Sequence, residues 1–491
     1  MLRPPNHTTH TQFNDWIDSI ISKRIEFFNS TAEGSLRPFV LFQFASKVKA
    51  LMTDHANDQK ALYRDFERWL LHLKCRALGH LTLCAKTARE HADLICKASV
   101  ALLTAHGGPI GWQLLSDDEH RRLLTTMLDA IYDEIGQARF DSMSDSEQFT
   151  IEFIVHTCCG MHKELNMVGG ANQAIMLVWE IHGFVPPILL LNKDAKRAQD
   201  HGAVFEGSRA GKLTRGGVKA AQLWGMLFKN NDPKKGYQDR FLVWASVEHS
   251  LELKLPDVNN VRFGCYTGAA TFLLLHTEIT IEFIEHVRET KTAGPSLTNV
   301  ENNVHSALRD DPTLHELAGL AYVGECISIP YMEHIRTPGV NALDLGPFNA
   351  KARQLCRTIA CNPELVIAPF HEDMHLKASL DGRPFRTPAV FHRIQALLHS
   401  GRLKYEILFR IVFAAFTGAA ETLERFCEEY KPGGKIARAA PELLKSVFVP
   451  ATNDANEGKI ADHGAFIRRA PSARLSFFNA ATMYKQNQSR R

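Results

Sequence analysis

The string His371-Glu372-Asp373-Met374-His375 matches the H-E-x-x-H pattern of zinc hydrolases. On a helix, residues four apart share one face, so the two imidazoles could bind Zn²⁺ while the glutamate acts as a general base. Pro369 precedes the string and Pro384 follows it closely, and both residues disfavour a long helix. We therefore expect a polar loop or short helix here and keep the zinc hydrolase as the third alternative for the function.

A second candidate is the pair Cys159 and His162, which has C-x2-H spacing. Thiolate and imidazole are ligands that zinc prefers, but a tetrahedral structural site needs four of them. No second pair follows at the spacing of a zinc finger. Two alternatives stay open, a Zn²⁺ site and a structural pair that packs and hydrogen-bonds at the end of a buried strand.

The third candidate is the segment from Thr452 to Gly458, which combines helix-capping residues with the carboxylate of Glu457. Asn453 or Asp454 would cap a helix and put Glu457 in its first turn. A carboxylate held there could face a metal ion or a cation, or it could be an ordinary first-turn residue.

The elements that must position these residues are predicted to be mainly α-helices. Residues 57–105 contain no proline and predict one long helix, or a helical hairpin that breaks near Gly79. The capping-box pairs Ser116/Glu119 and Ser144/Glu147 predict two further helix starts. We expect at most a small β element, around 150–160 and 450–460, and an extended segment at Ile188–Asn192. The expected regions are a helical region over 1–110, a helical region with the C-x2-H segment over 111–195, a flexible Gly/Lys-rich loop over 196–218, a large helical domain over 219–434 and a C-terminal element with a basic tail over 435–491.

Composition narrows the class of protein. The chain has 491 residues, 45% of them apolar, and a net charge of +3, so any nucleic-acid role must come from a local basic patch. The start of the sequence has no apolar stretch of the kind that a signal peptide carries, and no apolar run reaches the length of a membrane span. With ten cysteines inside mainly helical patterns, we expect reduced thiols and a nuclear or cytoplasmic protein without a membrane partner.

Four strings together resemble a known group of proteins. They are Thr157–Asn166, Asn260–Cys265, Asn341–Pro347 and Thr452–Gly458. Thr157–Asn166, Asn260–Cys265 and Thr452–Gly458 are similar, in this order, to the C-x2-H motif, the "TRW/F-x-S" segment of the helical insertion and the "TN…E" segment of RNase H-fold transposases of the hAT and Kyakuja–Dileera–Zisupton groups. The strings around Met161–Gly170, Asn341–Pro347 and Thr452–Gly458 look like transposon-derived fungal proteins. The resemblance covers roughly residues 110–485.

The resemblance implies a metal-dependent DNA strand transferase with an RNase H-like core. Its reaction uses two divalent ions, Mg²⁺ in an active enzyme, held by two Asp and one Glu. Glu457 would be the last of these acids, supported by Thr452 and Asn453. The two Asp partners are not identified, because the aspartates upstream of Cys159 lie in helical or turn contexts: Asp129, Asp133, Asp141 and Asp145. The first half of the catalytic core is therefore missing or replaced, which favours a protein without strand-transfer activity.

Two kinds of partner are expected from the residues that remain. Double-stranded DNA would meet basic residues of the insertion-like region, and such contacts would make the affinity fall with salt. These residues are Lys212, Arg215, Lys219, Lys234, Lys235 and Arg262. A helical scaffold or interaction protein with no nucleic-acid role is the alternative, with self-association through residues 57–105.

Overall fold

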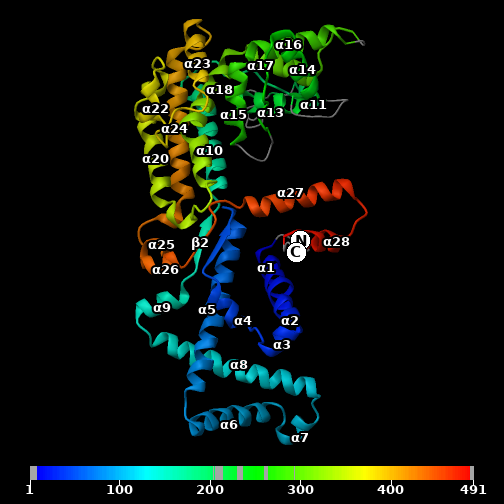
Figure 1. Ribbon diagram of the computed structural model, residues 1–491, viewed down its shortest axis with the longest axis vertical. Coiled ribbons are helices and arrows are strands. Elements are labelled where there is room, and N and C mark those ends of the chain that lie inside the picture. The colour runs from blue at the N-terminus through cyan, green and yellow to red at the C-terminus, as the bar shows by residue number, and fades with distance from the viewer. Residues whose placement is uncertain are drawn as a thin grey trace. The chain divides into compact units, whose positions relative to one another are not determined.

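The structure is a computed structural model that describes residues 8–202, 204, 214–228, 236–258, 264–291 and 294–486. It is mainly α-helical with one two-stranded sheet, as the sequence predicts. The chain forms two compact units (Figure 1). The first unit comprises residues 1–158, 432–449 and 454–491, and the second comprises residues 159–431 and 450–453.

The first unit contains both strands and the N- and C-terminal helices. Its elements are α1 (Thr9–Asn14), the π-helix η1 (Asp15–Ser22), α2 (Lys23–Asn29), α3 (Ala32–Leu36), α4 (Leu41–Lys47), β1 (Ala50–Thr53), α5 (Asn57–Cys84), α6 (Ala88–Ala105), α7 (Gly108–Gln113), α8 (Asp117–Asp141), α9 (Asp145–Glu152), β2 (Val155–Cys158), α25 (Lys435–Arg438), α26 (Pro441–Lys445), α27 (Asp454–Arg469) and α28 (Leu475–Gln486).

The core of the first unit forms around α5. Phe66 and Leu70 of α5 are buried against Ile21 and Ala45 of the N-terminal helices and against Ile154, which precedes β2. Strands β1 and β2 are parallel, with Ala50 opposite Val155 and Thr53 opposite Cys158. The predicted β element at 150–160 is therefore present, whereas at 450–460 only Pro450 makes an isolated bridge and a helix begins at Asp454.

Gly79 does not break the long helix, which corrects the sequence prediction. Helix α5 runs through Gly79 to Cys84, and the break lies at residues 85–87, after which Thr87 and Glu90 form the capping box of α6. Gly79 instead packs against Gly136 of α8, because a Cβ on either glycine would overlap a backbone carbonyl of the other helix. The predicted capping boxes of α8 and α9 are both formed.

In the second unit, the residues that the structure describes form helices, connecting loops and isolated β-bridges. Its elements are α10 (Gly160–Ile181), α11 (Lys193–Asp200), α13 (Gly216–Phe228), α14 (Gln238–His249), α15 (Cys265–Leu275), α16 (Thr277–Glu289), α17 (Asn299–Arg309), α18 (Asp311–Val323), the π-helix η2 (Gly324–Ser328), α19 (Ile329–Ile335), η3 (Ala342–Asp344), α20 (Gly346–Cys361), α21 (Glu364–Ile367), η4 (Glu372–Met374), α22 (His375–Ala378), α23 (Ala389–His399), α24 (Tyr405–Phe426) and η5 (Glu428–Tyr430).

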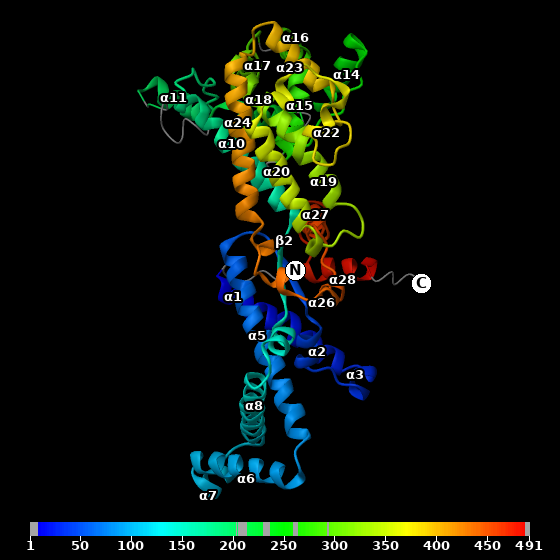
Figure 2. The ribbon, with the colours of Figure 1, turned by 90° about the vertical axis from the view of Figure 1, so that its left-hand side faces the viewer.

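Helices α10, α20 and α24 lie side by side in the second unit, with α18 packed against α10 and α24 (Figures 1 and 2). Helix α18 is buried from Thr313 to its last residue, Val323, which makes it the central element of this core. The expected loop at 196–218 begins inside α11 and ends inside α13, while residues 203 and 205–213 lie outside the described residues. The predicted extended segment is present, since Leu189 forms an antiparallel bridge with Arg215. No described helix has both the length and the apolar composition to cross a bilayer.

Candidate functional site

The predicted pair Cys159 and His162 lies in the first turn of α10, where Cys159 is the N-cap. The fully buried Cys159 thiol donates a hydrogen bond to Oδ1 of Asn453 at 3.1 Å. Next to it, the backbone N–H of Gly160 donates to the carbonyl of Ala451 at 2.9 Å. The two ends of the second unit are therefore joined side by side at this helix terminus.

The thiol of Cys159 is held in a polar environment although it is buried. Burial raises its pKa, but hydrogen bonds from His162 and from the backbone of Asn453 outweigh this effect and leave the pKa below its ordinary value. Across the ranges that the structure describes, no three His, Cys, Asp or Glu side chains are grouped to hold a metal ion. The contacts seen here, a buried thiol hydrogen-bonded beside the end of a strand, are those of the structural alternative, since β2 ends at the preceding residue. The zinc alternative stays a prediction.

Lys163, the next residue along, has only 1% of its side chain exposed and pairs with Glu429 at 2.5 Å. Its ammonium group also lies 5.4 Å from the ring centroid of Tyr430, a cation–π distance. The hydroxyl of Tyr430 in turn donates to the carbonyl of Ala342 at 2.7 Å. A buried charge of this kind needs a close partner of opposite charge. For Lys163 this partner is Glu429, which lies 266 positions later in the sequence.

Glu164 is the last residue of a run of polar side chains that begins at Cys159, which we call the polar run, and it is also buried. Burial raises the pKa of its carboxyl to about 7, against the opposing effects of a hydrogen bond from Ser328 and the charge of Arg336. The hydroxyl of Ser328 donates to Oε1 of Glu164. The backbone of Gly264 passes so close to this carboxylate that a Cβ there would overlap it.

These contacts bring together all four strings that carry the family resemblance. The polar run lies in Thr157–Asn166, and it meets Gly264 of the second string and Asn453 of the fourth. The third string joins through Ala342, and through Asn341, which forms an antiparallel bridge with Pro450. We call this set the α10 junction. It consists of residues 159–164 with Gly264, Ser328, Asn341, Ala342, Glu429, Tyr430, Pro450, Ala451 and Asn453.

Glu457, the acid named by the resemblance, lies in the first unit, as do the upstream aspartates Asp129 and Asp133. Glu457 is in the first turn of α27, as predicted from the sequence, and half-buried. Arg76 donates hydrogen bonds to Asp133 at 2.7 and 2.8 Å and to Asp129 at 2.9 Å. Asp129 and Asp133 are therefore ion-paired residues of α8, and the Arg76 guanidinium lowers the pKa of Asp133.

The His371–His375 string does not form the helix that a zinc hydrolase needs. His371 has an extended backbone, the next three residues form a single 3-10 turn, and α22 begins only at His375. The ring nitrogen Nδ1 of His375 lies 2.5 Å from the carbonyl oxygen of Glu372. The two imidazoles consequently do not share one helix face, and the polar loop or short helix expected from the flanking prolines is present.

Of the six predicted DNA-contacting residues, the structure describes Arg215 and Lys219. Both are half-buried at the start of α13. Glu316 lies beneath this helix start, where it accepts hydrogen bonds from the Gly217 N–H at 2.8 Å and from Trp179 Nε1 at 2.7 Å. Burial raises the pKa of Glu316 to about 7, and the charge of Arg215 opposes the shift. The others, Lys212, Lys234, Lys235 and Arg262, lie outside the described residues.

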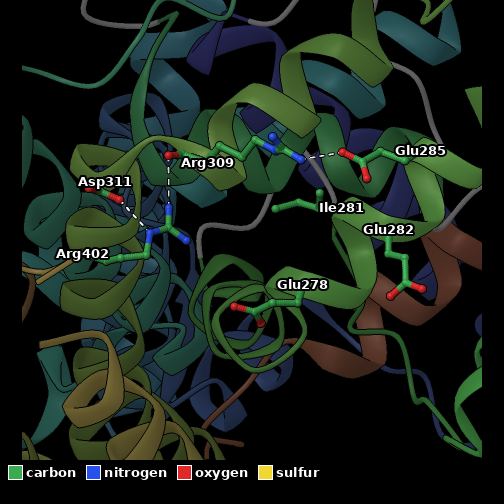
Figure 3. A pocket seen from close by; sticks show the side chains of 7 residues that line it. All are labelled: Glu278, Ile281, Glu282, Glu285, Arg309, Asp311 and Arg402. Atoms are coloured by element: carbon green, nitrogen blue, oxygen red, sulfur yellow. Dashed lines mark hydrogen bonds and ion pairs between the residues drawn. The ribbon is translucent and has the colours of Figure 1, made fainter. Parts of the chain in front are cut away.

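A charged hollow of about 610 Å³ opens along α16 (Figure 3). Its lining consists of Glu278, Ile281, Glu282, Glu285, Arg309, Asp311 and Arg402. Arg309 pairs with Glu285 at 2.5 Å and Arg402 with Asp311 at 2.9 Å, as the dashed lines in Figure 3 mark. The size would suit a small molecule, but such pockets are mainly apolar, and here Ile281 is the one apolar side chain of the lining. We therefore regard it as a network of ion pairs.

No protein-family model matches this sequence, and neither a curated protein nor a solved structure is significantly similar to it. The residues of the α10 junction thus stand on their geometry alone. Sequence reasoning missed the roles of Lys163 and Glu164, although two adjacent charged residues at the start of an apolar helix are a signal that could have drawn attention to them.

Proposed function

We propose that this chain is a derivative of an RNase H-fold transposase of the hAT or Kyakuja–Dileera–Zisupton type, which binds double-stranded DNA without cutting it. The α10 junction carries the proposal. Its four strings carry the resemblance and lie between residues 157 and 458, and residues from all of them meet around the first turns of one helix. Unrelated strings would not be expected to converge in this way.

The course of the chain supports the same origin. In such transposases a helical insertion separates the C-x2-H motif from the segment with the last acid. Here the chain first enters the helical second unit at Cys159 and leaves it for the last time at Asn453, with residues 432–449 belonging to the first unit in between, and the side chains of Cys159 and Asn453 are hydrogen-bonded at 3.1 Å. A unit whose two ends lie together is what an insertion into another fold requires.

We propose binding without cleavage because of the state of the acidic side chains that a cleavage reaction would need. A two-metal reaction needs three carboxylates around Mg²⁺ ions about 3.5–4 Å apart. Glu457 could supply one of them, but Asp129 and Asp133 are engaged by Arg76 at hydrogen-bond distance. These two aspartates do not fit a site for a pair of metal ions, so we derive no catalytic step through such a pair. We therefore propose DNA binding in the nucleus as the function of the chain.

DNA binding by the purified full chain across a salt series tests the proposal, with nicking followed in the same samples. Each phosphate contact contributes about 0.9 to the slope of log affinity against log salt, so replacing Lys212, Lys234 and Lys235 by alanine should reduce the slope by about 2.7. Lys351→Ala/Lys377→Ala is the matched control, because both lysines are exposed on other elements of the same unit. It should leave the slope unchanged.

Two outcomes would overturn the proposal. Nicking that is lost in Glu457→Gln would mean that the chain is an active nuclease whose Asp partners lie elsewhere. No binding at any salt concentration would remove DNA from the function, and the helical scaffold would then take its place.

A further inference from the structure

A second hollow, in the first unit, is lined by mainly apolar side chains. Its volume is about 350 Å³, and it lies between one face of η1 and α2 and the chain that leads into α4. Small-molecule sites have volumes of roughly 300–1,000 Å³ and are mainly apolar, with a few polar groups that orient the ligand. This hollow has that composition, since Arg24 is its one charged lining residue. We call it the α2 pocket, and its apolar lining consists of Ile20, Ile21, Ile25, Phe28, Phe39 and Phe44.

The walls of the α2 pocket are formed by the chain itself. The side-chain amide of Asn29, the last residue of α2, donates to the carbonyl of Phe39 at 2.8 Å and accepts from the backbone N–H of Phe39 at 2.8 Å. These two hydrogen bonds fix Phe39 beside α2. The opposite wall includes the end of η1, and π-helices are rare and frequently found at functional sites. A pocket whose walls are already in place binds a ligand at a lower entropic cost.

The apolar lining of the α2 pocket is still in contact with solvent. Only Ile21 is buried in the core of the unit. Phe28 is 37% exposed, and the other four apolar residues are half-buried. An apolar group in the pocket would remove this surface from water, which favours binding. The lining therefore calls for a ligand with an apolar body.

The charges around the α2 pocket indicate the sign of the ligand. Residues 20–49 contain five Lys or Arg and two Asp or Glu. Among the residues that the structure describes, no carboxylate pairs with Arg24, and none lines the pocket. A second cation is close, since Nζ of Lys47 lies 5.3 Å from the ring centroid of Phe39. A guanidinium binds a carboxylate through two parallel hydrogen bonds, so Arg24 complements a carboxylate at the edge of an apolar pocket.

We propose that the α2 pocket binds a carboxylic acid with an apolar chain, of the fatty-acid class. The chain of the ligand lies on the apolar lining, and its ionised carboxylate accepts hydrogen bonds from the guanidinium of Arg24. Lys47 supplies a further positive charge next to Phe39. This inference is independent of the DNA-binding proposal, because none of its residues belongs to the α10 junction or to the six residues predicted to contact DNA.

Isothermal titration calorimetry of the full chain with octanoate, below the concentration at which it forms micelles, tests the proposal. Octanol and octyltrimethylammonium are the matched ligands, since they carry a similar apolar chain with a neutral or a positive head. We expect one octanoate to bind per chain, about tenfold more tightly than octanol, because only the carboxylate makes charge-assisted hydrogen bonds to Arg24. The cation should not bind measurably.

Two pairs of variants assign the binding to this pocket. Arg24→Gln should lower the affinity for octanoate about tenfold and leave that for octanol unchanged, which a general loss of structure would not do. Lys23→Gln is its control, because Lys23 is also exposed on α2 but does not line the pocket. Phe28→Ser should weaken both ligands, since both use the apolar lining. Phe27→Ser should weaken neither, because Phe27 is 73% exposed and lies outside the lining.

Four results would overturn the proposal. They are the absence of saturable octanoate binding, equal affinities of the wild type for octanoate and octanol, equal losses in Arg24→Gln and Lys23→Gln, and equal losses in Phe28→Ser and Phe27→Ser. Vesicles of phosphatidylcholine and phosphatidylglycerol serve as a further probe. If the chain bound these vesicles but not octanoate, the surface would be a contact with anionic membranes instead of a site for a free carboxylic acid.

Discussion

Cys159 and Asn453 lie 294 positions apart, and the thiol of the first donates a hydrogen bond to the amide oxygen of the second at 3.1 Å. The contact joins the first and the last residue of the second unit. Because each side chain belongs to a string noticed for its resemblance to a transposase, one hydrogen bond links the sequence argument to the fold.

The first prediction concerns that bond. Asn453→Ala removes the acceptor and leaves the buried thiol without it, so we expect a loss of about 1 kcal/mol in the free energy of unfolding. Cys159→Ala should cost a similar amount. In the double variant the two losses should not add, and chemical denaturation of all four chains measures the difference. Fully additive losses would mean that the hydrogen bond does not contribute to stability.

The second prediction concerns the pair of Lys163 and Glu429. Lys163→Met removes the ammonium group that pairs with the carboxylate of Glu429, which is only 11% exposed, and removing one member of a buried pair costs about 3–5 kcal/mol. Lys163→Met/Glu429→Leu removes both charges and should recover a large part of the loss. A double variant as unstable as the single one would show that packing, not charge, is what the substitution disturbs.

The sequence predicted the elements of this chain better than their contacts. The spacing of apolar residues and the Ser116/Glu119 capping box predicted where helices lie, because both signals depend only on residues close together in the sequence. Residues 57–105 were expected to form one long helix or a hairpin that breaks near Gly79, yet Thr87 and Glu90 form a capping box, which predicts the start of a second helix at residue 88. A glycine is needed at position 79 because Gly136, 57 positions later in the sequence, packs against it. No local sequence pattern reveals such a contact.

In the candidate site, too, the sequence predicted local features but not contacts between distant residues. The sequence drew attention to Cys159 and His162, as a Zn²⁺ site or a structural pair, and it placed them at the end of a strand because a strand end followed by a helix start is a local arrangement. It could not supply Glu429 as the partner of Lys163, because the choice of a distant partner depends on how α10 and α24 pack.

The third prediction tests the glycine crossing of α5 and α8. A Cβ at Gly79 would lie 1.8 Å from the carbonyl oxygen of Tyr132, so Gly79→Ala must push the two helices apart. We expect thermal unfolding to show a loss of at least about 1–3 kcal/mol, the usual cost of overpacking. Gly268→Ala is the control. It lies inside α15 with nothing within 4 Å of its Cβ, so it should stabilise by about 0.5–1 kcal/mol through helix propensity. Equal effects at the two glycines would contradict the crossing.

The fourth prediction is a pH dependence of stability that comes from Glu164. Burial raises the pKa of this carboxyl in the folded protein from 4.5 to about 7, so the folded state prefers the protonated form. Its contribution to stability is therefore fully present below pH 4.5 and is lost as the pH rises through about 7, with a total change on the order of 3 kcal/mol. In Glu164→Gln the side chain cannot ionise, and its amide oxygen can still accept the hydrogen bond from Ser328. Denaturant midpoints between pH 4.5 and 8 should then fall less steeply than in the wild type, while Glu406→Gln, an exposed control, should follow the wild-type curve. Parallel curves for wild type and Glu164→Gln would mean that Glu164 ionises in the folded protein as readily as in the unfolded chain.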